Sequence, residues 1–128
     1  MKSLVIAFLV LCMVLVGSSC RLPSLTRGLD EILALEIHDI DLSSIANGNY
    51  RGTYNCERWK NTLEVTVQDH AITAITIIKD VTFAKSEVTD AIFSKVIQSQ
   101  SLQVDAVSGS TVTSKAYLKS MELALENL

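Results

Sequence analysis

Three stretches in the middle of the chain alternate between apolar and polar residues, which is the period of a β-strand. They cover residues 49–57, 62–68 and 71–79. The second alternates most cleanly, because its apolar residues Leu63, Val65 and Val67 all fall on one face. The third is partly apolar on both faces, so we predict that it is the central strand of an antiparallel sheet.

Turn residues separate these stretches. Asn47 and Gly48 belong to a clear turn signal at the start of the first stretch. Asp69 and His70 form a two-residue link, which predicts a hairpin between the second and third strands. We expect His70 to adopt a positive φ at some cost, because glycine is the residue that best suits that position.

Apolar residues at helical spacing predict helices before and after the strands. They cover residues 29–37, 87–100 and 113–127, with residues 102–110 as a loop and Ser86 or a neighbour as the cap of the second helix. The expected buried residues of the last two helices are Val88, Ala91, Ile92, Phe93, Val96, Ile97, Ala116, Tyr117, Met121, Ala124, Leu125 and Leu128. This order predicts an α+β domain, an antiparallel β-meander with flanking helices.

The first 19 residues have the layout of a secretory signal peptide. The apolar run from Leu4 to Val16 follows Lys2 and is shorter than the roughly 20 residues that span a bilayer. The run leads through small residues to Cys20 and resembles the lipobox of bacterial lipoproteins, although Gly17 stands where leucine is usual. The resemblance implies a lipid on Cys20; an ordinary cleaved signal and an uncleaved anchor are the alternatives. The expected parts are a signal peptide (1–19), a tether with a short helical arm (20–38) and a domain (39–128).

Charge and hydropathy exclude several classes of protein. The mean hydropathy of +0.32 reflects the N-terminal run and does not indicate a polytopic membrane protein. The net charge is −3; removal of residues 1–19 takes away Lys2 and no acid, so 10 bases remain against 14 acids, a net charge of −4. A strongly basic nucleic-acid binder is therefore excluded, and no nucleic-acid partner is expected.

The cysteines predict neither a disulfide nor a metal site in the domain. Cys12 leaves with the signal peptide and Cys20 is expected to carry lipid, so Cys56 has no cysteine partner. His38 and His70 lie far apart in the sequence, which makes a zinc site improbable. The simplest interpretation of Cys56 is a half-buried small residue.

The segment 105–114, Asp-Ala-Val-Ser-Gly-Ser-Thr-Val-Thr-Ser, opens the predicted final helix. Free backbone N–H groups and the positive end of the helix dipole make such a place a natural phosphate site. Gly109 can adopt a positive φ and lets the backbone approach an anion. Plain helix capping is the alternative, since Ser and Thr are favoured N-caps. The segment is not a Walker loop, because the Gly-Lys-Ser/Thr ending is missing.

This segment resembles the flavinylation signature of FMN-binding-domain proteins, Asp-x-x-Ser-Gly-Ala-Thr-x-Thr-Ser. The family includes the covalent-flavin subunits of sodium-pumping NADH:quinone reductase and of the related ferredoxin-coupled complex, and small single-domain lipoproteins. The resemblance covers about residues 39–128. Residues 47–54 are similar to the Asp-Gly-x-Tyr-x-Gly opening of the family, residues 63–78 to its hairpin and residues 98–113 to its ending.

The resemblance implies that FMN is joined through its phosphate to Thr111 as a phosphoester. A separate flavin transferase, which uses FAD and a divalent metal, makes this bond in the family. The implied cofactor-binding residues are Asp105, Ser108, Gly109, Ser110, Thr111, Val112 and Thr113. Asp105, Ser108 and Gly109 would be recognition elements. Ser110 stands where alanine is usual and offers a competing hydroxyl, while Thr113 is the second candidate acceptor.

The resulting hypothesis is an extracytoplasmic, membrane-tethered flavoprotein that relays electrons between membrane redox partners, such as a membrane electron-transfer complex and a reductase. It would be an electron-transfer module on the periplasmic side or outer surface, and not an enzyme with its own substrate. The aromatic candidates to stack on the flavin, each with core or turn packing as the alternative, are Tyr50, Tyr54, Trp59 and Phe83. Two hypotheses compete: a binding lipoprotein of the same fold without flavin, and a small reductase acting on a soluble substrate.

Overall fold

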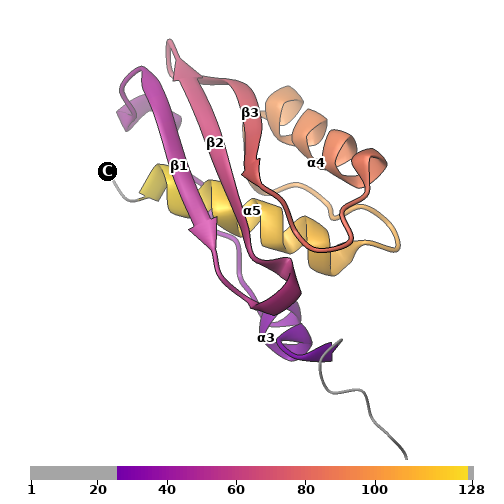
Figure 1. Ribbon diagram of the computed structural model, residues 1–128. Helices are drawn as coiled ribbons and strands as arrows, with labels where there is room; N and C mark the ends of the chain where they lie inside the picture. The colour runs from indigo at the N-terminus through magenta and orange to yellow at the C-terminus, as the bar shows by residue number, and fades with distance from the viewer. Residues whose placement is uncertain (1–25, 127–128) are drawn as a thin grey trace, which may run out of the picture.

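The computed structural model describes residues 26–126. In chain order its elements are α3 (Leu29–Leu33), η1 (Leu42–Ser44), β1 (Gly48–Tyr54), η2 (Glu57–Trp59), β2 (Asn61–Gln68), β3 (Ala71–Lys79), α4 (Ser86–Ser99) and α5 (Thr111–Glu126), where η marks a 3-10 helix (Figure 1). The predicted α+β class with an antiparallel meander is confirmed. No helix in the described range is long and apolar enough to cross a membrane. The predicted signal peptide, Cys20 and Leu128 lie outside this range.

The centre of the sheet is β2, with β1 and β3 antiparallel on its two sides. The prediction that the third stretch is central is therefore wrong, and a β-bulge explains the error. The register shifts at Thr73, which has no residue opposite it on β2. Ile72 before the bulge and Ile75 and Ile77 after it all pair with the buried residues of β2. These three isoleucines, which simple alternation divides between two faces, thus lie on one face, while Ile78 is exposed.

The hairpin turn between β2 and β3 is the predicted one. Asp69 and His70 have φ values of 50° and 61°, the arrangement that matches the twist of the flanking strands. His70 therefore carries the strain of a left-handed conformation without being glycine. The first predicted strand ends earlier than expected, at Tyr54, and Glu57 (φ 48°) opens η2 instead.

The helices differ from their predicted bounds, mostly by one or two residues. α3 ends at Leu33 and not at residue 37, and only Ile32 is buried in it. α4 begins at Ser86, with its neighbour Lys85 as the N-cap and no side-chain capping bond. α5 begins at Thr111, two residues before its predicted start, so this threonine belongs to the first helical turn.

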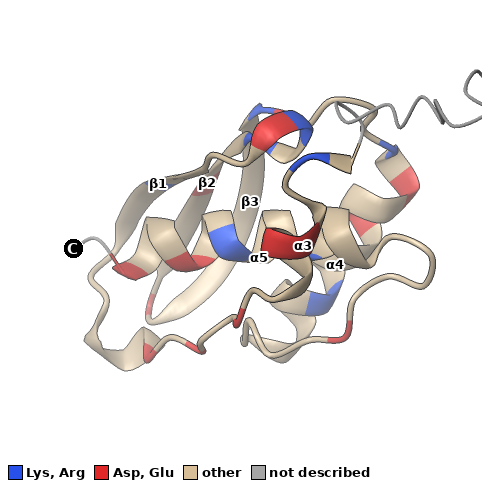
Figure 2. Ribbon diagram, turned by 90° about the horizontal axis from the view of Figure 1, so that it is seen from below, with Lys and Arg blue, Asp and Glu red and all other residues tan. Residues whose placement is uncertain are grey.

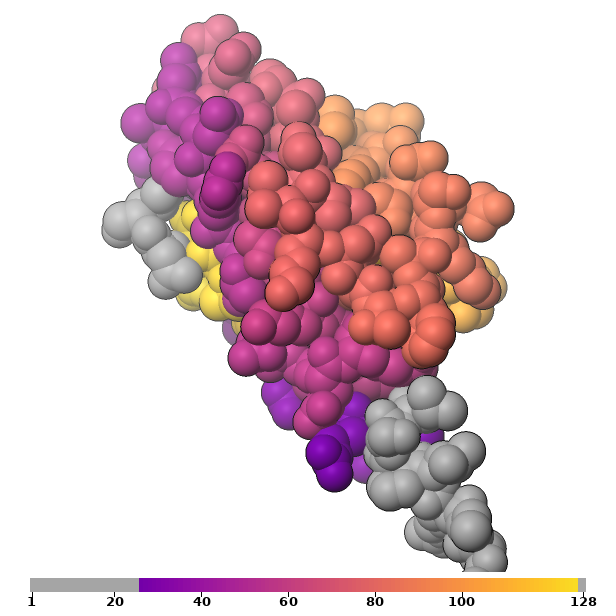
Figure 3. All heavy atoms as spheres, viewed as in Figure 1, coloured from indigo at the N-terminus to yellow at the C-terminus, as the bar shows by residue number. Residues whose placement is uncertain are grey.

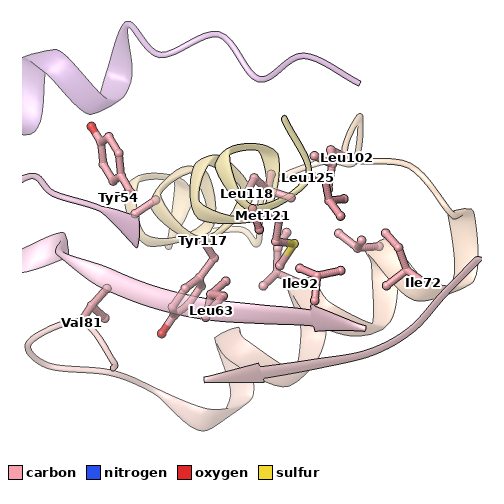
Figure 4. Packing of buried hydrophobic residues seen from close by; sticks show 14 of the residues in the cluster. Tyr54, Leu63, Ile72, Val81, Ile92, Leu102, Tyr117, Leu118, Met121 and Leu125 are labelled. Atoms are coloured by element: carbon pink, nitrogen blue, oxygen red, sulfur yellow. The ribbon is translucent and has the colours of Figure 1, made fainter. Parts of the chain in front are cut away.

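The core lies between the inner face of the sheet and the two long helices. α5 crosses β1 and β2, and α4 packs beside β3 (Figure 1). Leu63, Ile92, Tyr117 and Met121 converge there, each with no exposed surface (Figure 4). The predicted buried residues that the structure confirms are Leu63, Val65, Val67, Val88, Ile92, Val96, Ala116, Tyr117, Met121, Ala124 and Leu125. Ala91, Phe93 and Ile97 are half-buried.

α5 approaches the sheet so closely at Gly52 that backbone meets backbone. A Cβ atom at Gly52 would lie 2.0 Å from the carbonyl oxygen of Ser120 and 2.4 Å from the backbone nitrogen of Ala124. Beside this contact, the buried Ser120 hydroxyl donates to Oδ1 of Asn61 at 2.6 Å. It also accepts from the backbone N–H of Tyr54 at 3.2 Å. These contacts fix α5, and with it the position of its first residue, relative to the sheet.

The arm between α3 and β1 is fastened to α5. Lys115 Nζ donates to the carbonyl oxygens of Leu33 and Leu35, at 2.9 and 3.2 Å. Further along, the buried Glu122 carboxylate accepts from the backbone N–H of His38 at 3.2 Å, and its other oxygen lies 3.2 Å from the ring nitrogen Nδ1 of the same residue. The described part of the arm is therefore packed onto the domain.

Candidate functional site

A hollow of about 280 Å³ lies beside the first turn of α5. Its walls come from η2, from the loop between β3 and α4, from residues 109–113, and from Leu29. In the space-filling view, the loop after β3 lies against η2 at the lower end of the molecule (Figure 3). The lining residues are Leu29, Arg58, Trp59, Thr82, Phe83, Lys85, Val88, Gly109, Ser110, Thr111, Val112 and Thr113. Five of the seven predicted cofactor-binding residues thus border one hollow.

The loop before α5 is folded so that Thr111 is exposed. Gly109 has a φ of 76°, the positive value expected of it, and the N–H of Ser110 closes the turn on the carbonyl of Val107 at 2.9 Å. The carbonyl of Ser110 accepts from the N–H of Ser114 at 3.0 Å, which makes Ser110 the N-cap. The hydroxyl of Thr111 forms no hydrogen bond with the described residues.

The neighbouring hydroxyls are placed differently. Ser114 is buried, and its Oγ accepts from the N–H of Val107 at 3.1 Å and donates to the carbonyl of Ser110 at 2.8 Å. Ser110 and Thr113 border the hollow but are half-buried. Among the hydroxyl residues of this segment that line the hollow, only Thr111 is exposed.

Asp105 and Ser108 do not line this hollow. Asp105 is exposed, and its backbone carbonyl accepts from Lys95 Nζ of α4 at 3.0 Å. It borders a second hollow, which is lined by residues of α4 and by residues 103–105. Ser108 is exposed in the turn. Both side chains are accessible to another protein, and their role as recognition elements stays a prediction.

Arg58 is the most unusual residue of the hollow. Its guanidinium carbon lies 4.3 Å from the ring centroid of Trp59 and 5.8 Å from that of Phe83, which are cation–π contacts. Its Nε is buried and has no hydrogen-bond partner in the described structure. Phe83 is 70% exposed and has a φ of 63°, a rare conformation for a bulky residue. Unsatisfied buried donors and strained backbone concentrate at functional sites.

The loop that carries Phe83 is held by the core. The hydroxyl of Tyr117 donates to Oδ1 of Asp80 at 2.6 Å. Burial, and then this hydrogen bond, raise the pKa of Tyr117 to about 12, so it remains a donor at neutral pH. The N–H of Thr82 donates to the carbonyl of Arg58 at 2.8 Å. The two walls of the hollow are therefore joined to each other and to α5.

Only two of the four predicted aromatic candidates reach the hollow. Trp59 and Phe83 line it, whereas Tyr50 and Tyr54 do not. The hydroxyl of Tyr50 donates to the carbonyl of Ala46 at 2.6 Å, and Tyr54 is buried in the core. Tyr50 therefore packs in the turn and Tyr54 in the core, which are the alternatives given for them above.

The hollow has a positive electrostatic character. Arg58 and Lys85 line it, and no Asp or Glu of the described chain does. The N-terminus of α5 adds a partial positive charge at the same border. Elsewhere on the ribbon, basic and acidic residues are interspersed (Figure 2). Aromatic walls and positive charge together suit an aromatic anion.

Comparison with known families decides the assignment. Residues 59–126 match the model of the FMN-binding domain, which is more than half of the 128 residues. The chain belongs to the FMN-binding domain family. The match begins at Trp59 in the hollow and runs through the loop and α5. Comparisons with curated proteins and with solved structures gave no match.

The residues of this FMN-binding domain fit the cofactor. Phe83 is exposed and offers a ring face for an aromatic system, whereas Trp59 is buried and carries the Arg58 guanidinium over its ring. The buried Nε of Arg58 has no hydrogen-bond acceptor in the described structure, and an oxygen atom of FMN would supply one. Lys85 and the N-terminus of α5 suit the phosphate. When bound, FMN supplies one- or two-electron chemistry that no side chain in the hollow offers.

Sequence reasoning missed three polar residues that line the hollow of the FMN-binding domain: Arg58, Thr82 and Lys85. They belong to no motif, and they meet Thr111 only because η2 and the β3–α4 loop fold together. The one available signal was the adjacent pair Arg58 and Trp59, since a guanidinium beside an indole is a common stacking pair.

Proposed function

We propose that this FMN-binding domain carries FMN covalently, as a phosphoester on Thr111, and relays electrons between membrane redox partners outside the cytoplasm. The observation that supports this proposal is the exposed and unpaired hydroxyl of Thr111 at the border of a cationic, aromatic hollow. Export by residues 1–19 and a lipid on Cys20 would place the domain on the periplasmic side or outer surface of the membrane.

Accessibility favours Thr111 over the other hydroxyls. A flavin transferase must bring its own active site to the acceptor oxygen, and Thr111 is exposed whereas Thr113 and Ser110 are half-buried. Ser110 suits its place, since serine is among the best N-cap residues. The serine in place of the alanine usual in the family leaves Thr111 exposed.

A covalent bond has a physical reason in a protein of this kind. The hollow is open, and a carrier outside the cytoplasm cannot recapture cofactor that diffuses away. Even a nanomolar site, worth about −12 kcal/mol, empties on sufficient dilution. A phosphoester bond does not dissociate on dilution, so it retains FMN where tight non-covalent binding alone would lose the cofactor.

The chemistry of the hollow supports a carrier. Its charged and hydroxyl-bearing side chains within the described chain are Arg58, Lys85, Thr82 and the hydroxyls of residues 110–113, which suit binding and orienting an anionic ligand. Electron donors and acceptors would therefore be separate proteins. A membrane electron-transfer complex and a reductase are the partners that we propose.

Intact mass tests the attachment. The full chain is co-expressed with a flavin transferase in an exporting host, then purified and denatured before weighing. We expect a gain equal to FMN less one water, mapped to the peptide that contains Thr111. Thr111→Ala should abolish the gain, and the matched variant Thr113→Ala should keep it.

Two outcomes of this experiment contradict the proposal. Wild-type chain of unmodified mass, beside a family member that is modified in parallel, would leave the binding lipoprotein without flavin as the better hypothesis. A full gain in Thr111→Ala would assign the bond to another hydroxyl. Unfolding curves of both variants show whether the fold is kept, since loss of one hydroxyl in the first turn costs at most about 1 kcal/mol.

A further inference from the structure

Arg58 forms no ion pair with a carboxylate among the residues that the structure describes. The ion pairs within residues 26–126 involve His38, Arg51 and Lys119, and Arg58 takes part in none of them. Its guanidinium rests instead against the rings of Trp59 and Phe83, with its Nε buried. A half-buried cation without a counter-ion stabilises negative charge that arises beside it, because solvent screens it less than it screens an exposed cation.

We propose that Arg58 raises the reduction potential of FMN held in this hollow, an inference that rests on the proposed function. An oxidised flavin ring is neutral, whereas uptake of two electrons and one proton leaves it with one negative charge. The phosphate bears the same charge in the oxidised and in the reduced cofactor. Its interaction with Arg58 therefore contributes little to the free-energy difference between these two states. The attraction between the guanidinium and the ring exists only after reduction, and it therefore favours the reduced form.

Arg58 suits this role better than the second cation of the hollow. Lys85 is exposed at the N-cap of α4, where water and salt screen its charge. The Arg58 guanidinium contacts two aromatic rings, and the backbone carbonyl of Arg58 accepts from the N–H of Thr82 at 2.8 Å. A fixed and partly desolvated charge acts more strongly than a mobile, hydrated one.

The test is a spectroelectrochemical titration of the full chain loaded with FMN on Thr111. We expect Arg58→Gln to lower the midpoint potential by about 30 mV or more, which corresponds to a tenfold change in the equilibrium of a two-electron couple. Arg58→Lys keeps the charge and should recover most of the potential. Arg51→Gln is the matched control, because it removes the same charge from the outer face of the sheet, where Arg51 pairs with Glu64 at 2.8 Å.

The outcomes separate this inference from the proposed function. Wild-type chain that takes up no FMN overturns both. Loaded Arg58→Gln with an unshifted potential overturns only the role of Arg58. Equal shifts in Arg58→Gln and Arg58→Lys would mean that packing, and not charge, is responsible; an equal shift in Arg51→Gln would mean that overall charge is responsible. If Arg58→Gln does not fold, Arg58→Met replaces it, because its apolar chain keeps the packing against Trp59 and Phe83.

Discussion

Gly52→Ala tests whether the packing of α5 on β1 positions the site. The added Cβ would lie 2.0 Å from the Ser120 carbonyl oxygen, whereas real Cβ atoms essentially never approach closer than 3.0 Å. The helix and the strand must therefore separate by about 1 Å. The two clashing atoms, the carbonyl oxygen of Ser120 and the nitrogen of Ala124, belong to the backbone and cannot rotate away as a side chain could. Overpacking by one methyl group costs about 1–3 kcal/mol in an ordinary core. We expect about 3 kcal/mol or more here, a large part of the roughly 5–15 kcal/mol that stabilises a small domain.

Chemical denaturation measures this loss, and Gly48→Ala is its control in the same strand. A Cβ at Gly48 would meet only the ring of Tyr50, at 3.5 Å, an ordinary contact. That variant should stay within about 1 kcal/mol of the wild type. Because α5 begins at Thr111, the Gly52 variant should also take up less FMN in the mass experiment. A loss below about 1 kcal/mol in Gly52→Ala, or equal losses in the two variants, would refute the argument.

Two further predictions concern stability. His70→Gly should stabilise the domain by about 1 kcal/mol in a denaturant titration, because glycine adopts the φ of 61° without strain, and a destabilised variant would contradict this. Burial alone raises the pKa of Glu122, but hydrogen bonds from Lys119 and from the backbone and ring of His38 outweigh it, so the pKa lies below its ordinary value of 4.5. Glu122 therefore stabilises the fold above about pH 4.5, and this stabilisation is lost as the pH falls through the lowered pKa. Glu122→Gln should remove that part of the pH dependence of the free energy of unfolding. Glu126→Gln, which changes an exposed residue of the same helix, should leave it unchanged. Identical pH dependences of stability for the wild type and Glu122→Gln would contradict this prediction.

The local features of this fold could be predicted from the sequence, and the features that depend on pairing could not. The alternation in β2 identified its buried face, because one face of that strand meets only the core. The same reasoning failed for β3, since the bulge at Thr73 changes which residues share a face, and a bulge is set by the partner strand. The short α3 was overestimated because the apolar residues after it pack as an extended arm.

The site divides in the same way. The motif around Thr111 could be found, because its residues are contiguous and their hydroxyl content is unusual. Arg58, Thr82 and Lys85 could not, because three segments must fold together before they share a wall. Tyr50 and Tyr54 were plausible as aromatic candidates by residue type alone, and only the direction of each side chain shows that they serve the turn and the core.

If Cys20 carries a lipid, the presence of Leu29 in the wall of the hollow would limit how far a bound flavin could lie from the membrane. Leu29 follows Cys20 by nine positions in the chain, and nine such steps span at most about 30 Å even when the chain is fully extended. With a lipid on Cys20, the mouth of the hollow would thus remain within about 30 Å of the bilayer surface. The carrier would then exchange electrons with redox groups close to the membrane surface. Redox groups in extramembrane domains that extend much farther from the bilayer would be too distant.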